Sequence, residues 1–309
     1  MYGGKEILKT IHFDITYFYN YHCEYCYQGV EKIQKHISDA VYDNFFIFLA
    51  GLKEKFNIHL IGGEPFLYPR FFEMVEGIVK LGHTVSLTTN FSLPENILEK
   101  FYNIAKDKIS FVKISFHLSQ IKDLDAFINK LLWFIDLVGD KRKFRLLCVL
   151  TSENFEKVKY LLSVIRKNNL KIDIQRQFDE NGYIEYNKEM EDFVEKEKCI
   201  DIPLHLIKDE QKFDVVGKMC YTGKYFCKIL IDGTVTRCFS KQWKGFDILG
   251  NLNKSPKVKM FDKAVPCLSC NKECRCIKGI NNMHMIDFNH SATKLEMLKY
   301  KLLSKIKLK

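Results

Sequence analysis

The sequence lacks the patterns that would place it in a membrane or outside the cell. No apolar run approaches the length needed to cross a bilayer, and residues 1–6 show no basic-then-apolar leader. Eleven cysteines could form disulfides in a small secreted chain, but this chain has 309 residues and gathers its thiols in metal-like clusters. We therefore expect a cytoplasmic protein without a membrane span, whose cysteines are reduced or bound to metal.

A nucleic-acid-binding module is also missing, although the formal net charge is +10. The lysines concentrate near the carboxyl end, where leucines interleave with them in the manner of an amphipathic helix. We expect a basic helix over residues 286–309, solvated and packed on the rest of the protein. An anionic membrane, a nucleic acid or an acidic peptide could also use such a helix. The sequence gives no reason to predict a nucleic-acid partner.

Short apolar segments alternate with longer helical patterns from about residue 11 to residue 178. This alternation predicts parallel βαβ units, and the hydrophobic fraction of 47% is enough for a substantial core. The expected strands are residues 11–16, 57–61, 84–90, 113–117, 143–150 and 171–178. Helix starts are expected at Ser38-Asp39 and at Ser152-Glu153. The sequence therefore predicts an α/β protein with six such units.

Two cysteines follow the first expected strand, on the loop where α/β barrels carry their chemistry. Cys23 and Cys26 are two residues apart, with Tyr25 directly before the second. Thiolates at this spacing can share a metal or a cluster, and an aromatic ring beside them can pack on the flat face of a ligand. A redox dithiol or a zinc site would give the same short pattern.

A glycine-rich turn ends the second expected strand. Gly62 and Gly63 allow close backbone approach to a ligand, while exposed carbonyl groups and Glu64 can meet an ammonium group. A tight turn followed by a proline at a helix start is the alternative, since Gly-Gly and Glu-Pro pairs are common in loops. The cysteine loop one βα unit earlier favours the ligand-binding interpretation.

These features together resemble the radical S-adenosylmethionine (SAM) enzymes. In that family three cysteines spaced C-x3-C-x2-C hold a [4Fe–4S] cluster and leave one iron open for SAM; here Tyr19 stands at the first position. The resemblance implies a partial (β/α)6 TIM-type barrel in which Cys23 and Cys26 hold the cluster. The SAM-binding residues that it implies are Tyr25, Gly62, Gly63, Glu64, Asn90, Ser115 and His117.

The second group of cysteines resembles the SPASM and Twitch extensions of this family. Cys220, Gly233 and Cys238 follow the C-x9–15-G-x4-C pattern, and an Asp-Gly turn before Cys238 predicts a hairpin. Four more thiols follow within ten residues: Cys267, Cys270, Cys274 and Cys276. Their C-x2-C-x3-C-x-C spacing departs from the usual SPASM run, so one auxiliary cluster or two can be accommodated, and Cys227 could contribute.

The expected organisation has a partial barrel over residues 1–180 and a connector over 181–219. A small cysteine-rich α+β extension over residues 220–285 and the basic helix would follow. Cys199 in the connector and Cys148 in an expected strand are interpreted as ordinary packed cysteines.

The resemblance implies reductive cleavage of SAM to a 5′-deoxyadenosyl radical that abstracts hydrogen from a peptide or protein. Such an oxidoreductase or maturase would need a reducing partner such as flavodoxin or ferredoxin. Tyr19 keeps other interpretations open, because a phenol is a harder and weaker cluster ligand than a thiolate. These are unusual cluster ligation, a degenerate scaffold that binds a ligand or partner, and a cysteine-to-tyrosine change confined to this sequence. A zinc-stabilised binding protein is a more distant alternative.

Overall fold

The computed structural model describes residues 8–25, 34–178, 184–197, 199, 217–238, 247–267 and 286–303. Cys26, Cys270, Cys274 and Cys276 lie outside these ranges, so their predicted roles as ligands stay predictions. Within the described ranges, no helix has both the length and the apolar character needed to cross a bilayer.

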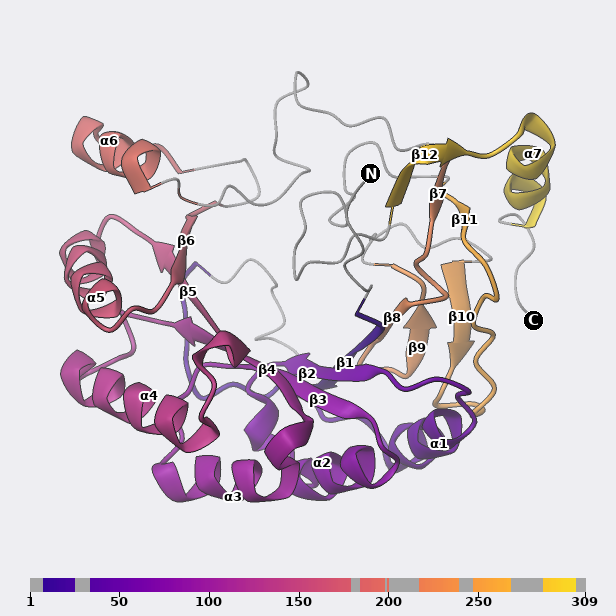
Figure 1. Cartoon of the computed structure of the whole chain (residues 1–309), viewed down its shortest axis with the longest axis horizontal. Coiled ribbons are helices and arrows are strands. Elements are labelled where there is room, and N and C mark those ends of the chain that lie inside the picture. Colours follow the sequence, from indigo (N-terminus) through magenta and orange to yellow (C-terminus); the bar gives the residue numbers. More distant parts are fainter. Residues whose placement is uncertain are drawn as a thin grey trace.

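Six parallel strands, each followed by a helix, form the centre of the molecule (Figure 1). The strands are β1 (Thr10–Thr16), β2 (Asn57–Gly62), β3 (Thr84–Thr89), β4 (Ile109–Phe116), β5 (Phe144–Leu150) and β6 (Ile172–Arg176). The helices are α1 (Asp39–Ala50), α2 (Phe71–Lys80), α3 (Glu95–Ala105), α4 (Leu124–Val138), α5 (Phe155–Lys167) and α6 (Lys188–Glu197). Short 3-10 turns are η2 (Pro65–Leu67), η3 (Lys106–Lys108) and η4 (Lys141–Lys143). The predicted α/β class and its βα units are confirmed.

The sheet continues past β1 with strands from the carboxyl-terminal part of the chain. β8 (Phe226–Ile229) pairs in parallel with β1, and β9 (Thr234–Thr236) and β10 (Ile248–Asn251) follow in antiparallel order. The order is β10-β9-β8-β1-β2-β3-β4-β5-β6. The hairpin predicted before Cys238 is confirmed as β8 and β9, with Gly233 in its turn at φ +84°.

A smaller sheet of three strands lies beside this hairpin. Its order is β11 (Val265–Pro266), β7 (Lys218–Cys220) and β12 (Ile286–Ser291), and α7 (Lys294–Leu303) follows β12. The helix expected from residue 286 is therefore a strand over its first six residues. Thr293 sets the true start, because its hydroxyl accepts a hydrogen bond from the amide of Glu296 at 3.2 Å.

The two predicted helix starts had different outcomes. Ser38 caps α1, and its hydroxyl accepts a hydrogen bond from the amide of Val41 at 3.3 Å. The start predicted at Ser152-Glu153 is wrong, since α5 begins at Phe155. Residues 151–154 form a turn instead, in which the amide of Thr151 donates to Oδ1 of Asn154 at 2.9 Å.

The sheet has one apolar face and one polar face. Alternate residues of β1–β6 and β8 pack into the hydrophobic core with the helices, as Val112, Ile114 and Phe116 do on β4. Helices α1–α5 lie along this outer face (Figure 1). The residues between them, such as Lys113 and Ser115, point to the opposite, inner face of the curved sheet. The sequence thus places its chemistry-bearing side chains away from the helices.

Candidate functional site

The glycine-rich turn packs against the loop that follows β1. The amide of Gly63 donates to the carbonyl of Thr16 at 2.7 Å, and the amide of Glu64 donates to the carbonyl of Phe18 at 2.9 Å. A Cβ on Gly63 would lie 2.0 Å from the Phe18 oxygen, and one on Gly62 would lie 2.1 Å from the Thr16 oxygen. Both glycines are therefore required by contact within the chain, where the sequence suggested approach to a ligand.

Glu64 is buried, and donors of the chain itself surround its carboxyl group. The hydroxyl of Thr89 donates to Oε1 at 2.9 Å, and the amide of Asn90 donates to Oε2 at 2.8 Å. Burial raises the pKa of Glu64 to about 7, although the hydrogen bonds from Asn90, Thr89 and Phe66 oppose that rise. Glu64 therefore joins the end of β2 to the end of β3.

Asn90 extends this connection to the cysteine loop. Its side-chain amide donates to Oδ1 of Asn20 at 2.7 Å, and Oδ1 of Asn90 accepts from the amide of Ser92 at 3.0 Å. Asn20 in turn donates to the hydroxyl of Ser92 at 2.7 Å. The loop after β1 and the loop after β3 are thus held together by three polar side chains.

Cys23, His117 and Tyr25 meet at the carboxyl end of β4. Nδ1 of His117 lies 2.9 Å from the sulfur of Cys23 and 2.9 Å from the hydroxyl of Tyr25. The rings of Tyr25 and His117 stack at 6.0 Å with an interplanar angle of 8°. Burial lowers the pKa of His117 to about 4, so its imidazole is neutral at pH 7 and Nδ1 can accept a hydrogen bond.

Tyr19 lies nearby, at the motif position where the family has its first cysteine. Its hydroxyl donates to the carbonyl of Gly62 at 3.3 Å, which directs the side chain toward the glycine turn. Ser115 is half-buried on the same face of β4 as His117. Among the residues that the structure describes, no three His, Cys, Asp or Glu side chains form a ready metal site.

Three predicted ligands of the second cysteine group lie around the small sheet and the end of β9. Cys220 pairs with Val265 in the register of β7 and β11, and the amide of Cys267 donates to the carbonyl of Lys218 at 2.9 Å. Burial, with a smaller contribution from Cys267, raises the pKa of Cys220 to about 11. Cys238 lies two residues after the last residue of β9, near the strand end where it was expected.

A buried guanidinium accompanies these thiols. Nε of Arg237 donates to Oδ1 of Asp247 at 2.5 Å, and the charges of Cys238 and Cys220 act on the same side chain. The guanidinium favours the thiolate of Cys220, the form that binds metals, but burial outweighs this effect and keeps the pKa of Cys220 raised.

Cys227 and Cys148 have a different environment from these ligand candidates. Both are buried in the hydrophobic core, Cys227 on β8 opposite Ile11 and Cys148 on β5. Burial raises the pKa of each thiol well above its usual range. The packing role expected for Cys148 agrees with this position. Cys227 faces the core, so it does not point toward Cys220 and Cys267.

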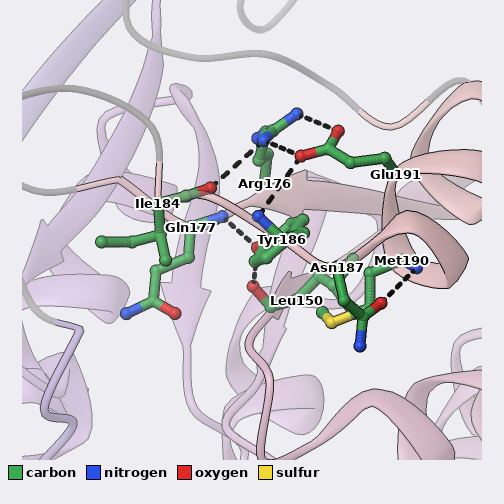
Figure 2. Close-up of polar contacts among 8 residues, drawn as sticks. All are labelled: Leu150, Arg176, Gln177, Ile184, Tyr186, Asn187, Met190 and Glu191. Atoms are coloured by element: carbon green, nitrogen blue, oxygen red, sulfur yellow. Dashed lines mark hydrogen bonds and ion pairs between the residues drawn. The ribbon is translucent and has the colours of Figure 1, made fainter.

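The segment before α6 is anchored to the ends of β5 and β6 (Figure 2). Arg176 forms an ion pair with Glu191 and donates to the carbonyl of Ile184 at 3.1 Å. The hydroxyl of Tyr186 donates to the carbonyl of Leu150 at 2.5 Å and accepts from the amide of Gln177 at 2.9 Å. This part of the expected connector is therefore fixed beside the carboxyl end of the sheet.

Comparison with solved structures relates this arrangement to known enzymes. No protein-family model matches the sequence, and no curated protein sequence matches it either. SuiB of Streptococcus suis, solved with S-adenosylmethionine bound, is similar with a TM-score of 0.54 at 15% identity. The match covers 83% of this chain and 66% of SuiB, so the chain spans slightly less than two thirds of that protein.

A second solved structure gives the same result. The enzyme anSMEcpe, solved with S-adenosylmethionine and the Cp18Cys peptide, matches with a TM-score of 0.51 at 19% identity over 82% of this chain and 80% of its own. Both are radical SAM enzymes. This chain shares the fold of these two enzymes. The identities are too low to carry more than the fold to this protein.

Sequence reasoning missed a set of polar side chains on the inner face of this fold. They alternate with core residues along the strands: His12, Asp14, His59, Lys113, Arg145 and Asp173. His59 bonds the hydroxyls of Ser86 and Thr88 at 2.8 and 3.0 Å, and burial lowers its pKa to about 3. The local signal was weak, since β4 and β5 each carry a single charged residue, Lys113 or Arg145, between residues that pack into the core.

Proposed function

We propose that this protein is a radical SAM-type enzyme that modifies a peptide or protein. The observation that carries the proposal is the position of Cys23. It lies at the carboxyl edge of the sheet, beside a glycine turn and a polar network that join the ends of three strands. The radical SAM fold supports the same conclusion, because active sites of such α/β barrels lie at this edge.

The donors around Cys23 fit a [4Fe–4S] cluster with mixed ligation. Cys23 and Cys26 would supply two thiolates, and Nδ1 of the neutral His117 imidazole is a third donor, 2.9 Å from the Cys23 sulfur. Imidazole replaces thiolate in some iron–sulfur centres, so nitrogen ligation is chemically reasonable. Tyr19 would then remain on the carbonyl of Gly62 and would not bind iron. When bound, a reduced cluster supplies the electron that cleaves SAM to methionine and a 5′-deoxyadenosyl radical.

The remaining residues of the edge would position SAM. Glu64 is already engaged by Thr89 and Asn90, so its role is to hold the strand ends in register. The ammonium group of SAM would instead meet carbonyl oxygens of the turn at Gly62 and Gly63. Ser115, half-buried on the inner face of β4, would offer a hydroxyl to the nucleoside.

A peptide substrate is favoured by what the related enzymes bind. SuiB has been solved with the precursor peptide SuiA, with a TM-score of 0.52 to this chain, and anSMEcpe with the Cp18Cys peptide. Cys220, Cys238 and Cys267, with three thiols outside the described residues, would hold one or two auxiliary clusters. A flavodoxin- or ferredoxin-like protein would supply electrons to the active site.

The test is anaerobic reconstitution followed by analysis of iron, sulfide and zinc and an assay for 5′-deoxyadenosine. The proposed function requires iron with sulfide and SAM cleavage after reduction. A Cys23→Ala variant should lose both the cleavage and part of the iron. Stoichiometric zinc without sulfide would instead indicate a zinc-stabilised binding protein.

A degenerate scaffold is a second candidate, favoured by the absence of a thiolate at Tyr19. It predicts SAM binding, measured by calorimetry, without cleavage under any reducing condition. Wild-type cleavage that depends on Cys23 would reject it.

A further inference from the structure

Two cations lie side by side on the inner face of the sheet. Lys113 on β4 and Arg145 on β5 are direct neighbours in the strand register. Both are half-buried, and the residues beside them in sequence, such as Val112 and Leu146, pack into the core on the other face. Their side chains therefore share the face that also carries Ser115 and His117.

No carboxylate of the described chain forms an ion pair with either cation. Lys228 on β8 shows the contrast, because its Nζ lies 3.0 Å from Oδ2 of Asp14. Lys113 and Arg145 have no such bond, and Asp173 on β6 attracts both only at longer range. The guanidinium of Arg145 instead lies over the ring of Phe111, 3.9 Å from its centroid.

This arrangement contributes little to folding. Burial lowers the pKa of Lys113 most; the more distant Asp173 opposes this effect, and the repulsion by Arg145 adds to it. Half-buried charges in proteins are normally paired, so an unpaired couple on a concave face is suited to an anion that arrives from outside. Arginine offers two parallel donors in a plane and lysine adds a point charge, a combination that fits a carboxylate.

We propose that Lys113 and Arg145 bind a carboxylate of the substrate, namely the side chain of an aspartate or glutamate in a peptide. That the substrate is a peptide rests on the proposed function. That it carries a carboxylate at this place is inferred from the cation pair. Asp173 leaves a net charge of about one positive unit at this place, which matches a carboxylate better than a doubly charged phosphate. Lys113 on β4 and His117, which directly follows β4, are four residues apart, about 13 Å along the strand direction. The acidic side chain would thus be anchored deeper in the barrel than the reacting edge at Cys23.

The test uses N-acetyl-glutamate methylamide as the probe and its glutamine analogue as the uncharged control, with binding followed by NMR titration. Wild-type protein should bind the glutamate probe and bind the glutamine analogue much more weakly. Lys113→Met and Arg145→Met should each weaken glutamate binding at least about tenfold. Lys113→Arg should retain most of it. Arg142→Met serves as the matched control, because Arg142 is an exposed cation that precedes β5.

Thermal unfolding distinguishes this role from a structural one. Removing a cation from an unpaired couple should leave the melting temperature unchanged or raise it, whereas a clear loss in both Met variants would assign the pair to folding and overturn the proposal. The third measurement is the affinity of each variant for SAM, determined by titration. Reduced SAM affinity with unchanged glutamate binding would assign the pair to the carboxylate of SAM and also overturn it.

Equal binding of the two probes by wild-type protein would overturn the substrate carboxylate as well. None of these measurements requires SAM cleavage. A protein that does not cleave SAM could therefore still bind the glutamate probe. A protein that does not bind the probe could still cleave SAM, so the two proposals fail independently.

Discussion

The sulfur of Cys23 lies 2.9 Å from Nδ1 of His117, although 94 positions separate the two residues in the sequence. One residue belongs to the loop after β1 and the other to the end of β4. Their contact brings a thiol and a neutral imidazole to one point at the carboxyl edge of the sheet. In the proposed function, the imidazole of this pair would replace the thiolate that the cysteine loop lacks at Tyr19.

His117→Ala should lower the iron bound after reconstitution, because the variant removes the donor nearest to Cys23. Ser115→Ala, on the same face of β4, is the matched control and should keep its iron. Pulsed electron paramagnetic resonance of the reduced wild-type protein should detect nitrogen coupled to a cluster, and the coupling should vanish in His117→Ala. Equal iron and no nitrogen coupling would exclude the imidazole as a ligand.

Tyr19→Cys should increase cluster content and the reductive cleavage of SAM, since it restores a third thiolate to the loop. Tyr19→Phe controls for the loss of the hydrogen bond to Gly62 and should resemble the parent in iron content. Both variants must keep the carboxyl-terminal cysteines, because the clusters proposed there would contribute to iron counts. If the cysteine variant gains neither cluster nor cleavage, the site differs from the family by more than one residue.

Gly63→Ala should destabilise the protein by about 3 kcal/mol or more, because its Cβ would collide with the carbonyl of Phe18. Gly139→Ala is the control. Gly139 has φ +74° and open space around it, so only the backbone cost of about 1 kcal/mol applies. Urea unfolding of both variants measures the difference. Similar losses would show that the loop after β1 can move away from the turn.

The role of these glycines illustrates what a sequence can and cannot provide. Alternation of apolar residues predicted β1–β6, because that pattern is local. The backbone that Gly63 approaches most closely is the carbonyl of Phe18, which lies on another loop and is distant in sequence. Sequence therefore indicated a close backbone approach at Gly63 but assigned it to a ligand. The contact between Gly63 and the loop after β1 depends on the pairing of β1 with β2, so only the structure shows it.

Glu64→Gln should change how stability depends on pH. The pKa of Glu64 is about 7 in the folded protein, above its ordinary value of 4.5, so the folded state keeps a proton that the unfolded chain loses between these values. The free energy of unfolding should therefore fall as pH rises from 4.5 to 7, by on the order of 3 kcal/mol. The variant should lack this part of the decline.

Chemical denaturation at several pH values measures that slope directly. The comparison uses the slope and not the absolute stability, since glutamine also alters the hydrogen bonds with Thr89 and Asn90. Parallel pH profiles for the two proteins would mean that Glu64 does not take up a proton in this range.

Replacing Cys267 and Cys270 together by alanine should lower iron and sulfide and destabilise the carboxyl-terminal part, because the metal binding proposed there would contribute to folding. Cys227→Ala is the matched control. Its thiol is buried in the core, so it should cost about 1 kcal/mol of stability and leave iron unchanged. The opposite result, iron lost with Cys227 alone, would move the auxiliary site to β8.

The candidate site was predictable where its residues form a motif and was missed where they are dispersed. Cys23 and Glu64 belong to short recognisable segments, whereas Lys113 and Arg145 each stand alone in a strand. Their relationship depends on the register of β4 and β5, which no local pattern encodes. The helix expected from residue 286 failed for a similar reason, since β12 forms through pairing with a distant strand.

The pairing of β8 with β1 has a consequence for the order of assembly during synthesis. β1 leaves the ribosome long before β8, so one of its two edges stays unsatisfied until residues 226–229 have been made. An early folding intermediate must therefore keep the amide and carbonyl groups of that edge exposed to other chains. A nascent chain stalled before residue 226 should consequently associate with other chains through β1, while the finished protein protects that edge with a strand of its own.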